Sequence, residues 1–174
     1  CLTSVTIGNS VETIGYSAFY GCTGLTSVTV GNSVETIGNY AFRDCTGLAS
    51  VTIGNSVKTI EYNTFYNCSN LEEVHISDIA AWCNITFANA NANPLYYAKN
   101  LYLDGNLIKD LVIPDGVEKI SDYAFYNCGL KSLTISATIE IIEMNAFQQN
   151  YQLETVQFEE NSELENIEKY AFKN

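Results

Sequence analysis

The chain has 174 residues, enough for one domain or a short repeat array, and 47% of them are hydrophobic, which is enough to supply a core. Its net charge of −12 repels nucleic-acid phosphates and anionic lipid, so neither is an expected partner. No apolar run approaches the roughly 18 residues of a membrane-spanning helix, which argues against direct membrane insertion.

The first part of the chain reads as strand, turn and short helical turn. Residues 2–7 alternate apolar and hydroxyl side chains and are rich in β-branched residues, which predicts a short half-buried strand. Gly8-Asn9-Ser10 favours a turn, and residues 11–14 return two apolar side chains to the interior. Residues 16–21 fit about one helical or 3-10 turn, and residues 22–24 lead into the next strand.

This unit recurs with a period of 23 residues, as leucines at positions 2, 25, 48 and 71 indicate. A fixed period in the twenties predicts a solenoid, in which each unit buries its apolar face against its neighbours. Length changes fall in turns and spare the apolar rows. The rows expected to form the core are Val11, Val34, Val57, Val117, Ile139 and Leu164; Ile14, Ile37, Ile60, Ile120, Ile142 and Ile167; and Phe19, Phe42, Phe65, Phe125, Phe147 and Phe172.

Cysteines occupy one further row of the repeat, at Cys22, Cys45, Cys68 and Cys128. Neighbouring coils of a solenoid lie about 5 Å apart, so disulfides along the row are geometrically allowed. Buried thiols are the favoured interpretation, because free cysteine suits tight apolar corners and Asn150 takes this place in the sixth copy. Without a C-x-x-C pair and with one histidine, the chain gives no support for a zinc site, and no other cofactor motif is present.

Residues 77–107 interrupt the repeat. Residues 78–83 predict a short helix with Asp78 near its N-terminus, and residues 87–94 are polar and turn-rich. The apolar runs on either side of Asp104-Gly105 predict a hairpin over residues 101–108.

The interruption contains aromatic side chains that have two alternative interpretations. It holds Trp82, the only tryptophan, together with Tyr96 and Tyr97. Exposed Trp and Tyr on loops are favoured binding anchors. Alternatively, Trp82 fills the space left by the irregular repeat, and this interpretation is the favoured one for Trp82. For Tyr96 and Tyr97 both remain open.

The repeat resembles the BspA-like leucine-rich repeats of bacterial surface proteins. The resemblance rests on Leu25-Thr26-Ser27-Val28-Thr29-Val30, Val34-Glu35-Thr36-Ile37-Gly38, Ala41-Phe42 and Cys45-Thr46-Gly47, and it extends through the Trp-containing interruption. It implies an α/β repeat: a right-handed leucine-rich-repeat solenoid with short parallel β-strands on the concave face and short helical or 3-10 turns elsewhere. It also implies an extracellular or cell-surface location, often with adhesion to host proteins, although partners differ between members.

We therefore expect a single solenoid over residues 1–174. Regular repeats fill residues 1–76 and 108–174, and the irregular Trp-containing segment with its hairpin fills residues 77–107. The chain begins at Cys1 rather than Met and has no signal peptide, so we expect a fragment of a longer protein.

Alternation along the strands places two rows of side chains on the concave face. In the first three copies these are Ser and Thr, a neutral hydroxyl surface without the Trp, Tyr or Arg typical of binding hot spots. Later copies are more varied and acidic, with Asp110 expected to follow Glu73 in one row and Val112 to follow His75 in the other. The predicted protein-binding face comprises Ser27, Thr29, Ser50, Thr52, Glu73, His75, Asp110, Thr134 and Gln157.

The sequence does not indicate an enzyme. His75 is the only histidine and has no partner nucleophile in a recognisable pattern, and Glu72 and Glu73 face opposite sides of a strand. Two hypotheses remain: a module that binds a protein, such as a host extracellular or surface protein, or a structural spacer that presents another domain of a longer surface protein.

Overall fold

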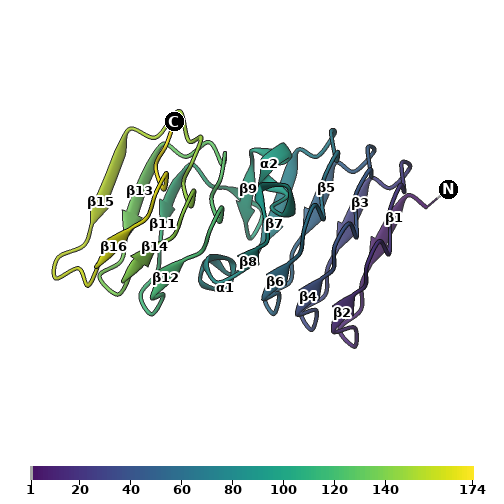
Figure 1. The fold of residues 1–174 in the computed structure, drawn as a ribbon, viewed down its shortest axis with the longest axis horizontal. Coiled ribbons are helices and arrows are strands. Elements are labelled where there is room, and N and C mark those ends of the chain that lie inside the picture. The colour runs from purple at the N-terminus through teal and green to yellow at the C-terminus, as the bar shows by residue number, and fades with distance from the viewer. Residues whose placement is uncertain (1) are drawn as a thin grey trace.

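The computed structural model describes residues 2–174 and forms a β-solenoid of about seven circuits of the chain (Figure 1). Each circuit is called a coil below. A regular coil contributes one longer strand and one two-residue strand, and successive coils follow one another along the long axis. The predicted leucine-rich-repeat solenoid with parallel strands is confirmed.

The longer strands form two sheets. The six-stranded sheet contains β1 (Ser4–Thr6), β3 (Ser27–Thr29), β5 (Ser50–Thr52), β7 (Glu73–Ile76), β9 (Leu101–Leu103) and β10 (Asn106–Leu107), and the three-stranded sheet contains β11 (Asp110–Val112), β13 (Ser132–Ile135) and β15 (Thr155–Phe158). Neighbours pair in parallel except for β9 and β10. Equivalent residues of successive copies face each other, as Val28 faces Val51, so apolar side chains stack in register beneath the sheet.

The other two-residue strands, apart from β10, form a second pair of sheets. One contains β2 (Thr13–Ile14), β4 (Thr36–Ile37), β6 (Thr59–Ile60) and β8 (Thr86–Phe87), and the other contains β12 (Lys119–Ile120), β14 (Ile141–Ile142) and β16 (Asn166–Ile167). The isoleucine row of the repeat lies in these strands, and its central members are fully buried.

In the regular coils, the segment after the two-residue strand differs from the helical or 3-10 turn expected there. In the first coil the N–H groups of Ser17, Phe19 and Gly21 donate to carbonyls of the next coil, while the N–H groups between them bond three residues back. Ser17 and Gly21 have φ values of 53° and 69°. In a helix, all backbone N–H donors bond to carbonyls of the same segment. Here the left-handed residues turn N–H groups toward the neighbouring coil, so a hydrogen-bond ladder between coils replaces the helix.

Helices of the described residues are confined to the irregular segment: α1 (Ile79–Cys83), the 3-10 helix η1 (Ala90–Ala92) and α2 (Leu95–Ala98). The predicted role of Asp78 is confirmed, because its carboxylate accepts a 3.0 Å hydrogen bond from the Ala81 N–H and caps α1. The hairpin is also confirmed. Asp104 and Gly105 have φ values of 48° and 79°, the two positive angles that a tight hairpin turn requires.

Phenylalanine rings stack through the middle of the solenoid. Phe42 is fully buried, and its ring lies 5.2 Å from that of Phe19 and 5.5 Å from that of Phe65, nearly parallel to both. A second stack joins Phe125, Phe147 and Phe172. These contacts confirm the predicted phenylalanine row as core.

Within residues 2–174, no strand pairing crosses from β10 to β11, and this junction is called the seam below. Side chains of the irregular segment span it. The Trp82 indole N–H donates to the Ala124 carbonyl at 2.8 Å, and the Asn93 amide donates to the Tyr123 carbonyl at 2.7 Å. A backbone bond from Ser121 to Cys83 adds to them. The irregular segment therefore joins two solenoid halves largely through side chains.

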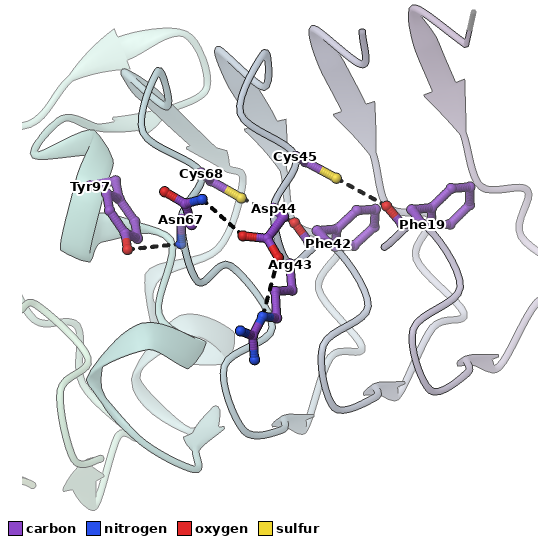
Figure 2. A network of polar contacts seen from close by, with 8 residues as sticks. All are labelled: Phe19, Phe42, Arg43, Asp44, Cys45, Asn67, Cys68 and Tyr97. Atoms are coloured by element: carbon purple, nitrogen blue, oxygen red, sulfur yellow. Dashed lines mark hydrogen bonds and ion pairs between the residues drawn. The ribbon is translucent and has the colours of Figure 1, made fainter. Parts of the chain in front are cut away.

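The cysteine row consists of thiols. Cys45 and Cys68 each donate from sulfur to the phenylalanine carbonyl of the preceding coil, at 3.1 Å and 3.2 Å (Figure 2). Asn150 makes the same kind of contact, because its amide donates to the carbonyls of Phe125 and Phe147. The row thus requires a small buried donor, which explains why Asn can replace Cys.

Candidate binding surfaces

The outward side chains of the longer strands form a surface called the strand face below. In each strand the central valine, such as Val28, Val51 or Val74, is buried in the core. Because side chains alternate along a strand, the residues before and after each valine face solvent. The nine residues predicted to face outward are all exposed or half-buried: Ser27, Thr29, Ser50, Thr52, Glu73, His75, Asp110, Thr134 and Gln157.

The predicted row in which Val112 follows His75 is wrong. β9 pairs with β7 and places Tyr102 directly beside His75, so the hairpin adds a strand that the 23-residue period does not contain. The alternation Leu101-Tyr102-Leu103 was the available signal. It is a strand pattern like the others, but it lies 27 residues after its partner rather than 23.

Glu73, His75 and Tyr102 form a compact cluster on the strand face. Nε2 of His75 lies 3.0 Å from a carboxylate oxygen of Glu73, an ion pair when the imidazole is protonated. The imidazole stacks on the Tyr102 ring with centroids 4.8 Å apart and planes 21° from parallel. Both contacts hold the imidazole in place, and the cluster offers a charged group, an aromatic ring and a hydroxyl side by side.

A shallow hollow of about 460 Å³ runs across the strand face to this cluster. Its lining includes Thr6, Thr29, Thr52, His75 and Asp104. Along its rim each asparagine side chain caps the next coil: the Asn32 N–H donates to the Asn9 side chain at 3.0 Å, and the Asn55 N–H to that of Asn32 at 3.1 Å. The hollow is thus lined by threonine, glycine, asparagine and apolar residues, and it reaches the ionisable side chains of His75 and Asp104.

The remaining predicted face residues lie across the seam. Asp110, Thr134 and Gln157 belong to the three-stranded sheet, and Asp110 accepts a hydrogen bond from the Ser132 hydroxyl. The structure therefore does not place them in one continuous sheet with Glu73 and His75. The predicted face is divided into two parts.

Trp82 is unavailable as a contact. Its side chain is 1% exposed, packs against Phe87 at 5.4 Å between ring centroids and donates to Ala124 across the seam. Of the two interpretations, filling of the irregular coil is therefore the correct one, and the alternative that Trp82 is an exposed binding anchor is wrong.

Tyr96 and Tyr97 are half-buried on α2. Their rings meet edge to face at 4.9 Å, and Tyr96 also stacks on Tyr126 at 5.7 Å. The Tyr97 hydroxyl accepts a 2.9 Å hydrogen bond from the Asn67 N–H (Figure 2). Both tyrosines thus pack against the turn segments of neighbouring coils while keeping part of each ring at the surface.

A polar network on these turn segments was missed in the sequence. Asp44 accepts hydrogen bonds from the Asn67 amide at 2.8 Å and from Nε of Arg43 at 3.3 Å (Figure 2). The Asn67 bond, followed by weaker contributions that include Arg43, lowers the pKa of Asp44. Arg43 is the only arginine of the chain, and this could have marked it as a candidate binding residue. A residue that occurs in one copy only is not detected by comparing the repeats.

Two thiols of the cysteine row are buried in the core. Burial raises the pKa of the Cys45 thiol to about 11 and that of Cys128 to about 12, which suppresses the nucleophilic thiolate. Within residues 2–174, no cluster of three His, Cys, Asp or Glu side chains is arranged to hold a metal ion. That same part of the chain contains no helix with the length and apolarity needed to cross a membrane.

The sequence matches the BspA type leucine-rich repeat region in six copies, over residues 1–104 and 81–174. The chain belongs to the BspA-type leucine-rich repeat family. Repeats of this kind generally mediate protein–protein interaction, and their fold is typically non-enzymatic. No curated protein matches the chain in sequence.

Solved structures of bacterial leucine-rich repeat proteins share the fold. A protein from Bacteroides ovatus aligns with a TM-score of 0.55 and 25% identity, covering 95% of this chain and 47% of its own. The leucine-rich repeat protein of T. pallidum aligns with a TM-score of 0.50 and 21% identity, covering 90% and 69%. A leucine-rich cell surface protein from Faecalibacterium prausnitzii aligns with a TM-score of 0.41 and 21% identity, covering 99% of this chain and 70% of its own. The chain thus spans about half the length of the Bacteroides protein.

Proposed function

We propose that the chain is a non-catalytic protein-binding module of a cell-surface or secreted bacterial protein, and that the Glu73–His75–Tyr102 cluster is its contact point. The observation that carries this proposal is the position of the cluster. It groups a carboxylate, an imidazole and a phenol, and its His75 lines a hollow to which the preceding coils contribute threonine, asparagine and apolar residues. Tyrosine is enriched at binding hot spots, and fixed side chains lose little conformational freedom on binding.

The charge of the chain supports the same choice of partner. A net charge of −12 favours association with neutral or basic protein surfaces and opposes binding to polyanions. Adhesion to a host protein is the specific form of this function that we propose, in line with the surface setting named for the Faecalibacterium protein.

Binding to a panel of immobilised extracellular-matrix proteins tests the proposal. The combined substitution Glu73→Ala and His75→Ala should weaken any binding by about tenfold, as removal of a hot spot does. Ser4→Ala, on the same face but outside both the cluster and the hollow, is the control and should retain binding. Equal affinity of both variants would refute the placement.

A structural spacer is the second candidate, and one observation favours it. Residues Ser4, Ser27 and Ser50 and residues Thr6, Thr29 and Thr52 repeat identically over three coils, which is expected of solvated scaffold rather than of a specific contact. A spacer role predicts that a scaffold of equal length and unrelated surface can replace this segment without loss of function in the full-length protein. Loss of function after such a replacement would contradict it.

A further inference from the structure

A second hollow lies on the turn segments, away from the strand face. It measures about 530 Å³ and is lined by Tyr16, Ser17, Tyr20, Tyr40 and Arg43. Tyr16 is 72% exposed and Tyr20 is 53% exposed. Exposed tyrosines around a hollow that also contains the chain's single arginine combine the two residue types most enriched in binding sites, together with Trp.

Arg43 is held in a defined orientation at the edge of this hollow. Its guanidinium carbon lies 4.8 Å from the ring centroid of Tyr66, 5.3 Å from that of Tyr40 and 6.0 Å from that of Tyr20. Its Nε donates to Asp44, whose other oxygen is engaged by Asn67. These contacts fix the planar group without using its Nη atoms, which make no hydrogen bond within residues 2–174.

The hollow offers several hydrogen-bond donors. The Arg43 guanidinium can only donate, and the hydroxyls of the tyrosines and of Ser17 can both donate and accept. The nearby carboxylate of Asp44 is already engaged by Arg43 and Asn67, and a hydrogen bond from Tyr20 contributes to its lowered pKa. A polyproline II segment is the complementary ligand, because its carbonyls have no internal partners and its prolines have no N–H.

The spacing of the tyrosines also matches a polyproline II helix. The Gly21 N–H donates to the Arg43 carbonyl and the Asp44 N–H donates to the Tyr66 carbonyl, so positions 20, 43 and 66 are equivalent on three successive coils. Tyr20 lines the hollow, and Tyr66 adjoins it on the far side of Arg43 without lining it. The two tyrosines are two coils apart, about 9.5 Å at the spacing of adjacent strands. A polyproline II helix advances about 9.3 Å per turn and so presents the same face to both rings.

We propose that the Tyr16–Tyr20–Tyr40–Arg43 hollow binds a proline-rich segment of a partner protein in the polyproline II conformation. The tyrosine rings receive the proline rings, and Arg43 and the phenolic hydroxyls donate to the ligand carbonyls, the mode used by other aromatic-lined grooves. This surface is independent of the strand-face cluster, and the segment it binds has little conformational entropy to lose.

Titration with a decaproline peptide tests the proposal, with a Gly-Ser peptide of equal length as the ligand control. We expect saturable binding of decaproline that Tyr16→Ala and Arg43→Ala each weaken by about tenfold. Arg43→Lys should also weaken it, because lysine keeps the charge and loses the planar donor fork. Tyr151→Ala removes an equally exposed tyrosine (70%) far from the hollow and should have no effect.

Three results would overturn the proposal. One is the absence of saturable binding at peptide concentrations up to about 1 mM. Another is equal binding by the Tyr16→Ala and Arg43→Ala variants and the parent, with thermal melts showing that all are folded. The third is binding of cello- or chito-oligosaccharides that depends on Tyr16 and Arg43 when decaproline does not bind, which would identify a glycan site. The Glu73/His75 double variant should bind decaproline normally. Failure of the decaproline test would therefore leave the proposed strand-face function standing, and the reverse also holds.

Discussion

Truncation of Phe42 probes the stacked core most directly. Phe42→Ala removes a fully buried ring that contacts Phe19 on one side and Phe65 on the other. Core aromatic truncations cost about 3–5 kcal/mol, and two lost ring pairs place this variant at the upper end of that range. For a domain of this size, each kcal/mol lowers the melting temperature by about 2–4 °C. We therefore expect a decrease of roughly 10–20 °C.

Thermal denaturation followed by far-UV circular dichroism measures this decrease. Phe19→Ala is the matched control, because Phe19 occupies the same row, is only half-buried and has a single stacking partner. It should melt between the parent and Phe42→Ala. A Phe42→Ala melt within a degree of the parent would refute the assignment of this row to the core.

Three further predictions concern contacts between coils. Asn150→Leu should cost at least about 3 kcal/mol in urea denaturation, because it leaves buried carbonyls without donors, whereas Asn150→Cys, the residue of the other copies, should cost less. Gly54→Ala should cost about 1–3 kcal/mol, since its Cβ would lie 2.5 Å from the Gly31 carbonyl oxygen, whereas Gly8→Ala meets no atom and should be neutral. Between pH 9 and about pH 11 the parent should lose stability relative to Cys45→Ala, because the thiol ionises first in the unfolded chain.

Each of these predictions has an outcome that contradicts it. Asn150→Leu as stable as Asn150→Cys would show that the buried amide is not a required donor. Equal costs at Gly54 and Gly8 would mean that coils do not approach as closely as the structure indicates. A stability difference between the parent and Cys45→Ala that does not change with pH above 9 would show that the thiol is accessible and ionises normally in the folded protein.

The core and its strands could be predicted from the sequence because the apolar rows recur in every regular copy, with length changes confined to turns. Val28 and Val51 face each other in the sheet at the spacing that the 23-residue period implies. The cap at Asp78 and the hairpin at Asp104-Gly105 were also predictable, since each depends on a few adjacent residues. Local chemistry and an exact repeat are both readable without knowledge of the fold.

The binding surfaces could be predicted only in part, because they depend on how coils stack. Tyr102 joins the strand face through a coil longer than the others, and its pairing with His75 cannot be read from a fixed period. Tyr20, Tyr40 and Tyr66 surround Arg43 from three different coils, and Tyr40 lies in a different row from the other two. A comparison of equivalent repeat positions in the sequence therefore does not group these residues, although the stacking of coils brings them together.

The seam has a mechanical consequence. A pulling force along the long axis loads every interface between coils in series, and the weakest one opens first. Elsewhere, strand ladders and the turn ladder share the load. At the seam, the described contacts are mainly side-chain ones: hydrogen bonds from Trp82, Asn93 and Asn127, the Tyr96–Tyr126 ring stack and apolar packing. They are joined by one backbone bond from Ser121. Under tension the solenoid should part there while each half stays stacked, and exposure of Trp82 to water would signal the rupture.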